Sequence, residues 1–261
     1  MRNGWIRGDG KDGPGMEAQH GGTAAVTTAD AEAALDAALE LFARRGYAET
    51  KLYAVAQQAG ISKRMIHYHF GDKRGLYLQA LALAEERLTP PAAVLERSSA
   101  VPVDGMRRFV DALFHAFLDH PDCVRLLLRE NLAPVLSADE SEHGQRDNLV
   151  SLHAERLLLL GQDAGAFRPG ISAQDILALV VSLCEFHVAH ERGIYAAGRV
   201  DFRDRRNVDG MRRMVIDTVL AFLTSNIAYS GYESYLRPAA AAAKPQPAAP
   251  QVYEVEANGI Y

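Results

Sequence analysis

The chain has 261 residues, of which 48% are hydrophobic and 23% are charged, as in an ordinary globular protein. Its formal net charge of −5 argues against a protein that coats nucleic acid through charge alone. No apolar run reaches membrane-spanning length, and the two cysteines, Cys123 and Cys184, lack metal-type spacing. These features predict a cytoplasmic protein without membrane contact or a disulfide framework, large enough for one small and one larger domain.

Residues 1–27 are rich in glycine, and their acidic and basic side chains nearly balance. They lack the apolar segment of an export signal. We interpret them as a disordered arm, because so few apolar side chains cannot offset the entropy of folding. An arm that reaches into a DNA minor groove is the alternative, but its neutral balance of charge favours disorder.

The first predicted helix covers residues 29–45. Leu35, Leu39 and Phe42 lie on one face at helical spacing, and Gly46 follows as the residue that ends the helix.

Two short helices joined by a glycine-containing turn come next. The first begins at Thr50, a good N-cap, and ends at Gly60, while Ser62 caps the second. This is the pattern of a helix-turn-helix, which places its second helix in a groove of DNA. The predicted buried face of the first helix consists of Leu52, Val55, Ala56 and Ala59.

The second short helix turns Ile66 and Phe70 inward by its periodicity. Two cations, an imidazole and a phenol therefore point outward, and these groups suit phosphates and base edges. The outward residues are Lys63, Arg64, His67 and Tyr68.

A third helix is predicted from Asp72, another N-cap residue, with Lys73 and Arg74 in its first turn. Cations at a helix N-terminus oppose the helix dipole, so we expect an anionic group such as a DNA phosphate nearby.

Residues 35–78 resemble the DNA-binding domain of the TetR family of bacterial transcriptional regulators. The similar motifs are LFARRGY at 41–47, the Thr50 cap, AGIS at 59–62 and HYHFGDKRGLY at 67–77, which are specific in combination. The resemblance implies phosphate contacts from Thr50, Tyr68 and Lys73. It implies base or groove contacts from Lys63, Arg64, Met65 and His67, and Lys51 adds to the local positive charge.

This chain departs from the family pattern at two of these positions. His67 stands where the family often has Tyr, and Arg64 stands where it often has a small residue. An arginine there is able to read guanine through O6 and N7.

The remainder of the chain is helical by periodicity, without a convincing strand. We therefore predict an all-α fold, in which an N-terminal three-helix helix-turn-helix DNA-binding domain precedes a helical ligand-binding and dimerisation domain. The predicted parts are a disordered arm (1–27), the DNA-binding domain (28–88), the effector-binding and dimerisation domain (89–232) and a disordered Pro/Ala-rich tail (233–261). The helices predicted after the helix-turn-helix cover residues 73–88, 104–119, 122–132, 142–162, 172–192 and 208–227.

The last two long helices have broad apolar faces. Residues 176–184, ILALVVSLC, are apolar almost all the way round, which indicates burial on more than one side. The resemblance implies that both helices pair with a second copy as a four-helix bundle, so that a homodimer binds a pseudo-palindromic operator on double-stranded DNA. The alternative is that both helices complete the core of a monomer.

The resemblance further implies a pocket for a small-molecule effector among the middle helices. Phenylalanine and leucine outnumber charged residues there, which favours an apolar or aromatic effector, although such residues also build ordinary cores. The candidate lining residues are Phe109, Leu113, Phe114, Phe117, Leu127, Asn131, Phe186 and His187.

Other chemistries find less support. Cys184, His187 and Glu191 share one helical face, but without a paired-cysteine or HExxH motif we predict neither a metal nor a cofactor. The sequence has no P-loop, GxGxxG or GxSxG motif, so we do not expect an enzyme. We predict a ligand-relieved repressor. The alternative is a similar DNA-binding protein that organises the chromosome without a small-molecule effector.

Overall fold

The computed structural model describes residues 28–95, 101–137, 149–190, 200–228 and 234–236. Regular structure within these ranges is helical throughout, so the predicted all-α fold is confirmed. The predicted arm and residues 237–261 of the predicted tail lie outside the described ranges. The helices are α1 (Thr28–Glu49), α2 (Leu52–Ala59), α3 (Lys63–Phe70), α4 (Lys73–Leu88), α5 (Ala92–Leu95), α6 (Pro102–Asp119), α7 (Pro121–Leu132), α9 (Leu149–Asp163), α10 (Ala173–Ala189) and α11 (Arg205–Thr224).

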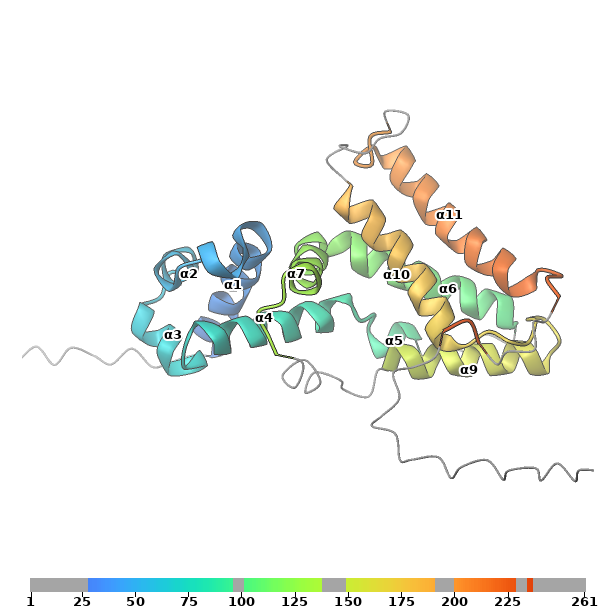
Figure 1. Ribbon diagram of the computed structural model, residues 1–261, viewed down its shortest axis with the longest axis horizontal. Coiled ribbons are helices and arrows are strands. Elements are labelled where there is room, and N and C mark those ends of the chain that lie inside the picture. Colours follow the sequence, from blue (N-terminus) through green and yellow to red (C-terminus); the bar gives the residue numbers. More distant parts are fainter. Residues whose placement is uncertain (1–27, 96–100, 138–148, 191–199, 229–233, 237–261) are drawn as a thin grey trace, which may run out of the picture.

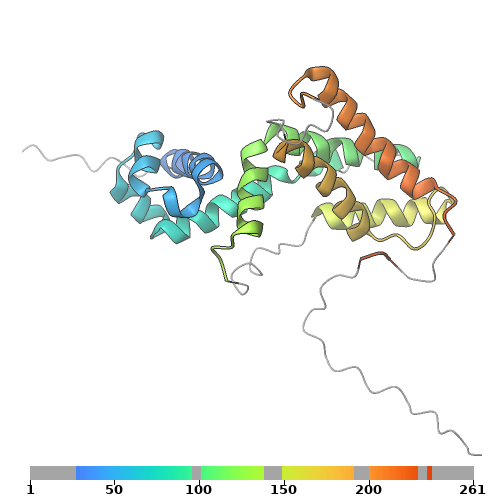
Figure 2. The same ribbon diagram turned by 45° about the horizontal axis from the view of Figure 1, so that its top comes forward.

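The helices α1, α2 and α3 form one end of the molecule, and α6, α9, α10 and α11 form the other (Figure 1). The helix α4 leads from the first group towards the second, and α7 lies between them (Figure 1, Figure 2). The helix-turn-helix is therefore joined to the body of the protein by one continuous helix.

Most predicted helix ends near the helix-turn-helix agree with the structure. The helical geometry of α1 is interrupted at Gly46 (φ 81°, ψ 170°), and Gly60 ends α2 in the left-handed region (φ 71°, ψ 20°). The Ser62 hydroxyl accepts a 3.2 Å hydrogen bond from the Met65 amide, and the Asp72 carboxylate accepts one of 2.8 Å from the Gly75 amide. Both side chains thus cap their helices as predicted.

The prediction that Thr50 caps α2 is wrong. The N-cap residue is Lys51, which makes no side-chain cap. Thr50 is only 1% exposed, and its hydroxyl lies 2.8 Å from the Gly46 carbonyl oxygen and 3.2 Å from that of Leu41. Its hydroxyl therefore binds the end of α1, since the break at Gly46 leaves carbonyl groups there without helical partners.

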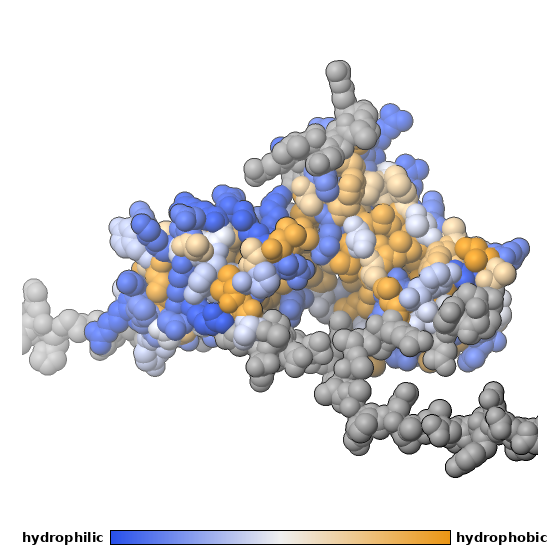
Figure 3. All heavy atoms as spheres, in the orientation of Figure 1, coloured by the Kyte–Doolittle hydropathy of each residue, from blue (hydrophilic) through white to orange (hydrophobic). Residues whose placement is uncertain are grey.

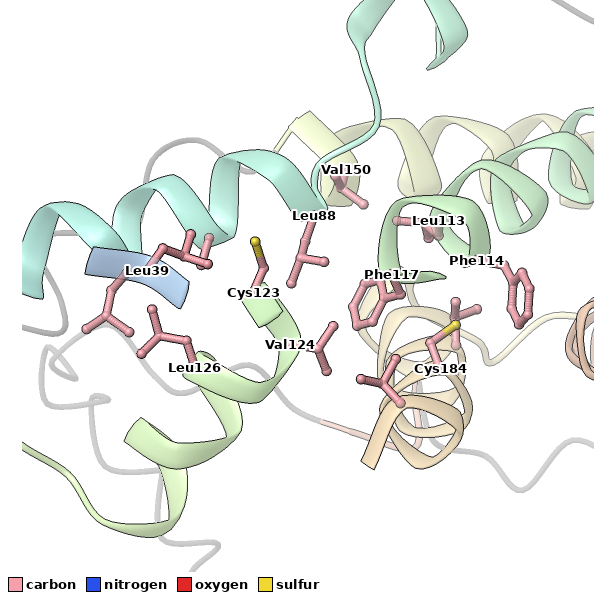
Figure 4. Close-up of a cluster of buried hydrophobic side chains, with 14 of the residues drawn as sticks. Leu39, Leu88, Leu113, Phe114, Phe117, Cys123, Val124, Leu126, Val150 and Cys184 are labelled. Carbon is pink, nitrogen blue, oxygen red and sulfur yellow. The ribbon is translucent and has the colours of Figure 1, made fainter. Parts of the chain in front are cut away.

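A single apolar core runs from the DNA-binding helices into the body. Leu39, Leu88 and Leu126, from α1, α4 and α7, meet at one side, and Phe114, Phe117 and Cys184 lie at the other (Figure 4). Val124 of α7 lies between the two groups (Figure 4). Because close-packed cores transmit displacement, a shift of α7 must be felt on both sides.

The two cysteines lie inside this core as free thiols. Burial raises the pKa of Cys123 to about 11 and that of Cys184 to about 12. Both groups are therefore neutral thiols at physiological pH.

Residues 234–236, which were predicted to belong to a disordered tail, instead pack against the start of α10. The carboxylate of Asp175, 6% exposed, accepts hydrogen bonds from the Tyr235 amide (3.2 Å) and the Leu236 amide (2.7 Å). It also accepts one of 2.8 Å from the Ser172 amide, which completes a capping box. The Tyr235 ring lies 5.5 Å from that of Phe222. One buried carboxylate thus joins α10 to the C-terminal segment.

We expect Asp175→Ala to lower the free energy of unfolding by about 2–4 kcal/mol, because the change removes a helix cap and leaves buried amides without an acceptor. Urea denaturation measures the loss. Asp217→Ala, at an exposed position of α11, is the matched control and should stay within about 0.5 kcal/mol of the parent. Equal effects of the two changes would contradict this role of Asp175.

We expect neither thiol of the folded protein to react with a thiol-specific disulfide reagent at about pH 8, because the thiolate is the reactive form and its population is minute there. The same protein unfolded in urea should react at both cysteines. Absorbance of the released thiolate follows the reaction. Rapid labelling of the native chain would show that at least one cysteine is accessible.

Candidate nucleic-acid interface

The outer face of α3 carries the groups expected of a DNA reader. Lys63, Arg64, His67 and Tyr68 are all exposed, with 72% of Tyr68 accessible to solvent. The opposite face is held in the core by Ile66 and Phe70, and Met65 is half-buried. Hydrophilic residues gather over much of the end of the molecule formed by α1, α2 and α3 (Figure 3). The helix therefore presents its donors outward on a firmly packed support.

The His67 ring is oriented by its own helix end. Its Nδ1 lies 2.7 Å from the carbonyl oxygen of Gly71. Because a carbonyl only accepts hydrogen bonds, Nδ1 carries the proton and donates it, which leaves Nε2 as the ring atom available to a partner. Lys51, at the start of α2, is also exposed.

Two predicted phosphate contacts have other partners in this structure. The Thr50 hydroxyl is buried against α1, as described above, and so does not face the α3 surface. The Lys73 ammonium donates to the Ala48 carbonyl at 3.2 Å and lies 4.5 Å from the centre of the Tyr47 ring. Partial burial lowers the pKa of Lys73, and Glu49 opposes that shift. The end of α1 thus supplies the acceptor that the sequence led us to expect from DNA.

The end of α7 fixes the position of α1. The Arg129 guanidinium donates to the carbonyl oxygens of Ala43 (2.8 Å) and Arg44 (3.1 Å). These carbonyl groups precede the break at Gly46, so Arg129 provides a cap from a distant helix.

The neighbouring Glu130 binds α4. Its carboxylate accepts a 2.8 Å hydrogen bond from the Tyr77 hydroxyl and further bonds from the Val135 and Leu136 amides. Burial and this hydrogen bond raise the pKa of Tyr77. Arg129 and Glu130 were not identified from the sequence, where they read as an ordinary charged helix end without a local signal of their distant partners.

The eight predicted effector-pocket residues differ in how deeply they are buried. Phe109, Leu113, Phe114 and Phe117 are buried in the core, Leu127 is half-buried and Asn131 is exposed. His187 is buried with its ring 5.9 Å from that of Phe114, whereas Phe186 is 43% exposed.

Two clefts are formed by other residues of the described ranges, and none of these eight residues lines either of them. One of about 570 Å³ is bounded by the end of α4, α5 and α6. The other, of about 230 Å³, is bounded by α1, α4 and the turn between α6 and α7.

Neither a metal centre nor a membrane span emerges from the residues described. Within those ranges, no three His, Cys, Asp or Glu side chains are grouped so as to hold a metal ion. Glu191, which shares a predicted helical face with Cys184 and His187, lies outside the described ranges. None of the helices described is long and apolar enough to cross a bilayer.

Two family models match this chain. The model described as "Bacterial regulatory proteins, tetR family" matches residues 34–80, and the one described as "Tetracyclin repressor-like, C-terminal domain" matches residues 102–219. The first range contains the helix-turn-helix, and the second contains most of the helical body.

Curated relatives extend over most of the same region. The chain is 28% identical over 178 residues to the HTH-type transcriptional repressor NicS of Pseudomonas putida, covering 66% of this chain and 82% of that protein. It is 24% identical over 201 residues to the HTH-type transcriptional regulator RutR of Escherichia coli, covering 74% and 92%.

Solved structures share the fold. A TetR family regulator, PfmR from Thermus thermophilus, has a TM-score of 0.54 at 24% identity and covers 72% of this chain and 96% of its own. A regulatory protein of the tetR family from Rhodococcus has a TM-score of 0.58 at 20% identity and covers 76% and 97%. With two family models that together match more than half of its residues, the chain belongs to the TetR family of bacterial transcriptional regulators.

Proposed function

We propose that this protein is a cytoplasmic, dimeric repressor that binds a pseudo-palindromic operator and is released by a small, apolar effector. The observation that carries the DNA-binding part is the exposed face of α3, where Lys63, Arg64, His67 and Tyr68 stand side by side. Among the described residues, neither Lys63 nor Arg64 forms an ion pair, so both cations are available to DNA. Repression is favoured because the relative NicS is named a repressor.

In this proposal Arg64 contacts a base, and phosphate groups are bound by Lys51, Lys63 and Tyr68. An exposed guanidinium on the second helix of a helix-turn-helix is suited to bidentate binding of guanine. Lys73 joins the phosphate contacts if DNA displaces its bond to Ala48.

Dimerisation is supported by α10 and α11, which pack side by side at the end of the molecule far from α3 (Figure 1, Figure 2). Met214 on α11 is 55% exposed, and Phe186 on α10 is also exposed. Leu179, Val181 and Leu183 on α10 are only half-buried. A twofold partner would cover these side chains and set two α3 helices about 34–36 Å apart, or at a multiple of that spacing.

Effector release is supported by the continuity of the core. An effector that separates α6 from α10, between Phe114 and His187, would displace α7 and with it the Arg129 cap on α1. The effector need only bind the displaced state about 1–3 kcal/mol more tightly than the DNA-binding state to weaken DNA binding measurably.

Selection of bound sequences from a random DNA pool, with the purified ligand-free chain, tests this function first. Recovery of a pseudo-palindrome with few genomic matches supports an operator-specific repressor. Enrichment of many weak sites across the chromosome would instead support an architectural protein. A pool that remains unchanged would contradict sequence-specific DNA binding by this chain.

We expect Arg64→Ala to cost about 1–3 kcal/mol of binding free energy at the selected sequence and to relax base preference at one position of each half-site. Fluorescence anisotropy on the selected duplex and on random DNA measures both effects. Arg108→Ala, an exposed arginine on α6, is the control and should bind both duplexes as the parent does. Equal losses on the two duplexes would deny Arg64 a base-reading role.

We expect Met214→Glu to convert the dimer into monomers, because it buries a carboxylate in the proposed interface. Sedimentation velocity at micromolar concentration measures the change. Affinity for a full palindrome should also fall by about 100-fold or more, because a monomer binds with one DNA-binding domain instead of two. Leu159→Glu places the same charge at an exposed leucine of α9 and should leave the dimer intact. A dimeric Met214→Glu protein would place the interface elsewhere.

A further inference from the structure

The larger of the two clefts has one apolar wall and one acidic rim. Its apolar wall is formed by Leu83 at the end of α4, by Pro91 and Val94 near α5, and by Ala112 and Ala116 on α6. Its volume of about 570 Å³ lies within the range of small-molecule sites. The two alanines leave open the space that longer side chains on α6 would fill.

The acidic rim comes from Glu86 on α4 and Asp119 at the end of α6. Both carboxylates are exposed, and neither forms an ion pair among the described residues. Arg87, the arginine that lines this cleft, is already paired with Asp36 on α1. Two histidines also line it: His115, whose Nδ1 lies 2.8 Å from the Asp111 carbonyl oxygen, and His120. The uncompensated charge of the cleft is therefore negative.

The smaller cleft continues the larger one, since both are lined by Arg87, Asp119 and His120. Its other acids have partners: Asp122 lies 2.8 Å from Arg125, and Glu40 lies 3.0 Å from Arg44. Of the two carboxylates without an ion pair, Glu86 lines the larger cleft and Asp119 lines both clefts.

We infer that the cleft between α4, α5 and α6 is a binding site for an organic amine with an apolar body. The body would contact Leu83, Val94 and Ala116, while the ammonium group would lie between Glu86 and Asp119. An anion would meet two carboxylates there, and a neutral molecule would leave both without a cation.

Occupancy of this cleft acts on the DNA-binding end through α4. Leu83, Glu86 and Arg87 lie on the last turns of the helix whose first turn supports α3, and the Arg87–Asp36 pair joins α4 to α1. An ammonium ion beside Arg87 would weaken that pair by repulsion. This regulatory step rests on the proposed function, whereas binding of the amine does not.

Three probes with one apolar body and different head charges test the site: 4-phenylbutylamine, 4-phenylbutanol and 4-phenylbutyrate. Calorimetric titration of the full chain without DNA should show the amine binding at least about tenfold more tightly than the other two. Glu86→Gln combined with Asp119→Asn should remove that preference. Glu155→Gln combined with Asp163→Asn, two exposed acids on α9, is the matched control and should retain it.

Absence of amine binding, equal binding of the three probes, or an unchanged preference after the Glu86→Gln and Asp119→Asn changes would overturn the site. Thermal melting of both double variants checks that each is folded. On the selected operator, the amine should weaken binding at least fivefold, the lower end of typical coupling. Failure to select any operator would refute the proposed function alone, because the titrations contain no DNA.

Discussion

The packing of α7 against α1 and α4 is the constraint on which the rest of the structure depends. Residues from all three helices share one apolar core, and the same core continues to α6 and α10. The last turn of α7 carries two charged residues, Arg129 and Glu130. Arg129 binds carbonyl groups of α1, and Glu130 binds the hydroxyl of Tyr77 on α4. The DNA-binding helices are therefore held by apolar packing and by directional hydrogen bonds at once.

In the proposed repressor, this arrangement would carry a change in the body to the DNA-binding helices. A flexible connection would let α3 reorient without consequence for the body, whereas a shared core makes the two move together. The end of α4 coincides with the predicted domain boundary after residue 88, but Leu88 at that boundary is itself a core residue. The apolar core therefore continues across the predicted domain boundary, and a displacement on one side of residue 88 would be felt on the other.

Local features were predictable from the sequence, and long-range ones were not. Gly60, Ser62 and Asp72 act on backbone within four residues, so their types and spacing suffice to predict helix ends. The exposed face of α3 likewise follows from helical periodicity. Lys73 and Asp175 behave differently because they also bind distant parts of the chain: the Ala48 carbonyl group of α1 for the first, and the amides of residues 235 and 236 for the second. No spacing rule within one helix contains such partners.

The hydrogen bonds of Tyr235 and Leu236 with Asp175 also decide which residues a shortened form of this chain would need. The matching family model stops at residue 219, so a chain trimmed to the family's boundaries would lose both amides while keeping the buried carboxylate. In such a shortened chain, water would have to replace these two amides at Asp175, at the start of α10, one of the two helices on which the proposed dimer depends. This contact lies fifteen residues and more beyond the family region, so a fragment meant to keep the start of α10 as it is here needs residues 234–236 as well.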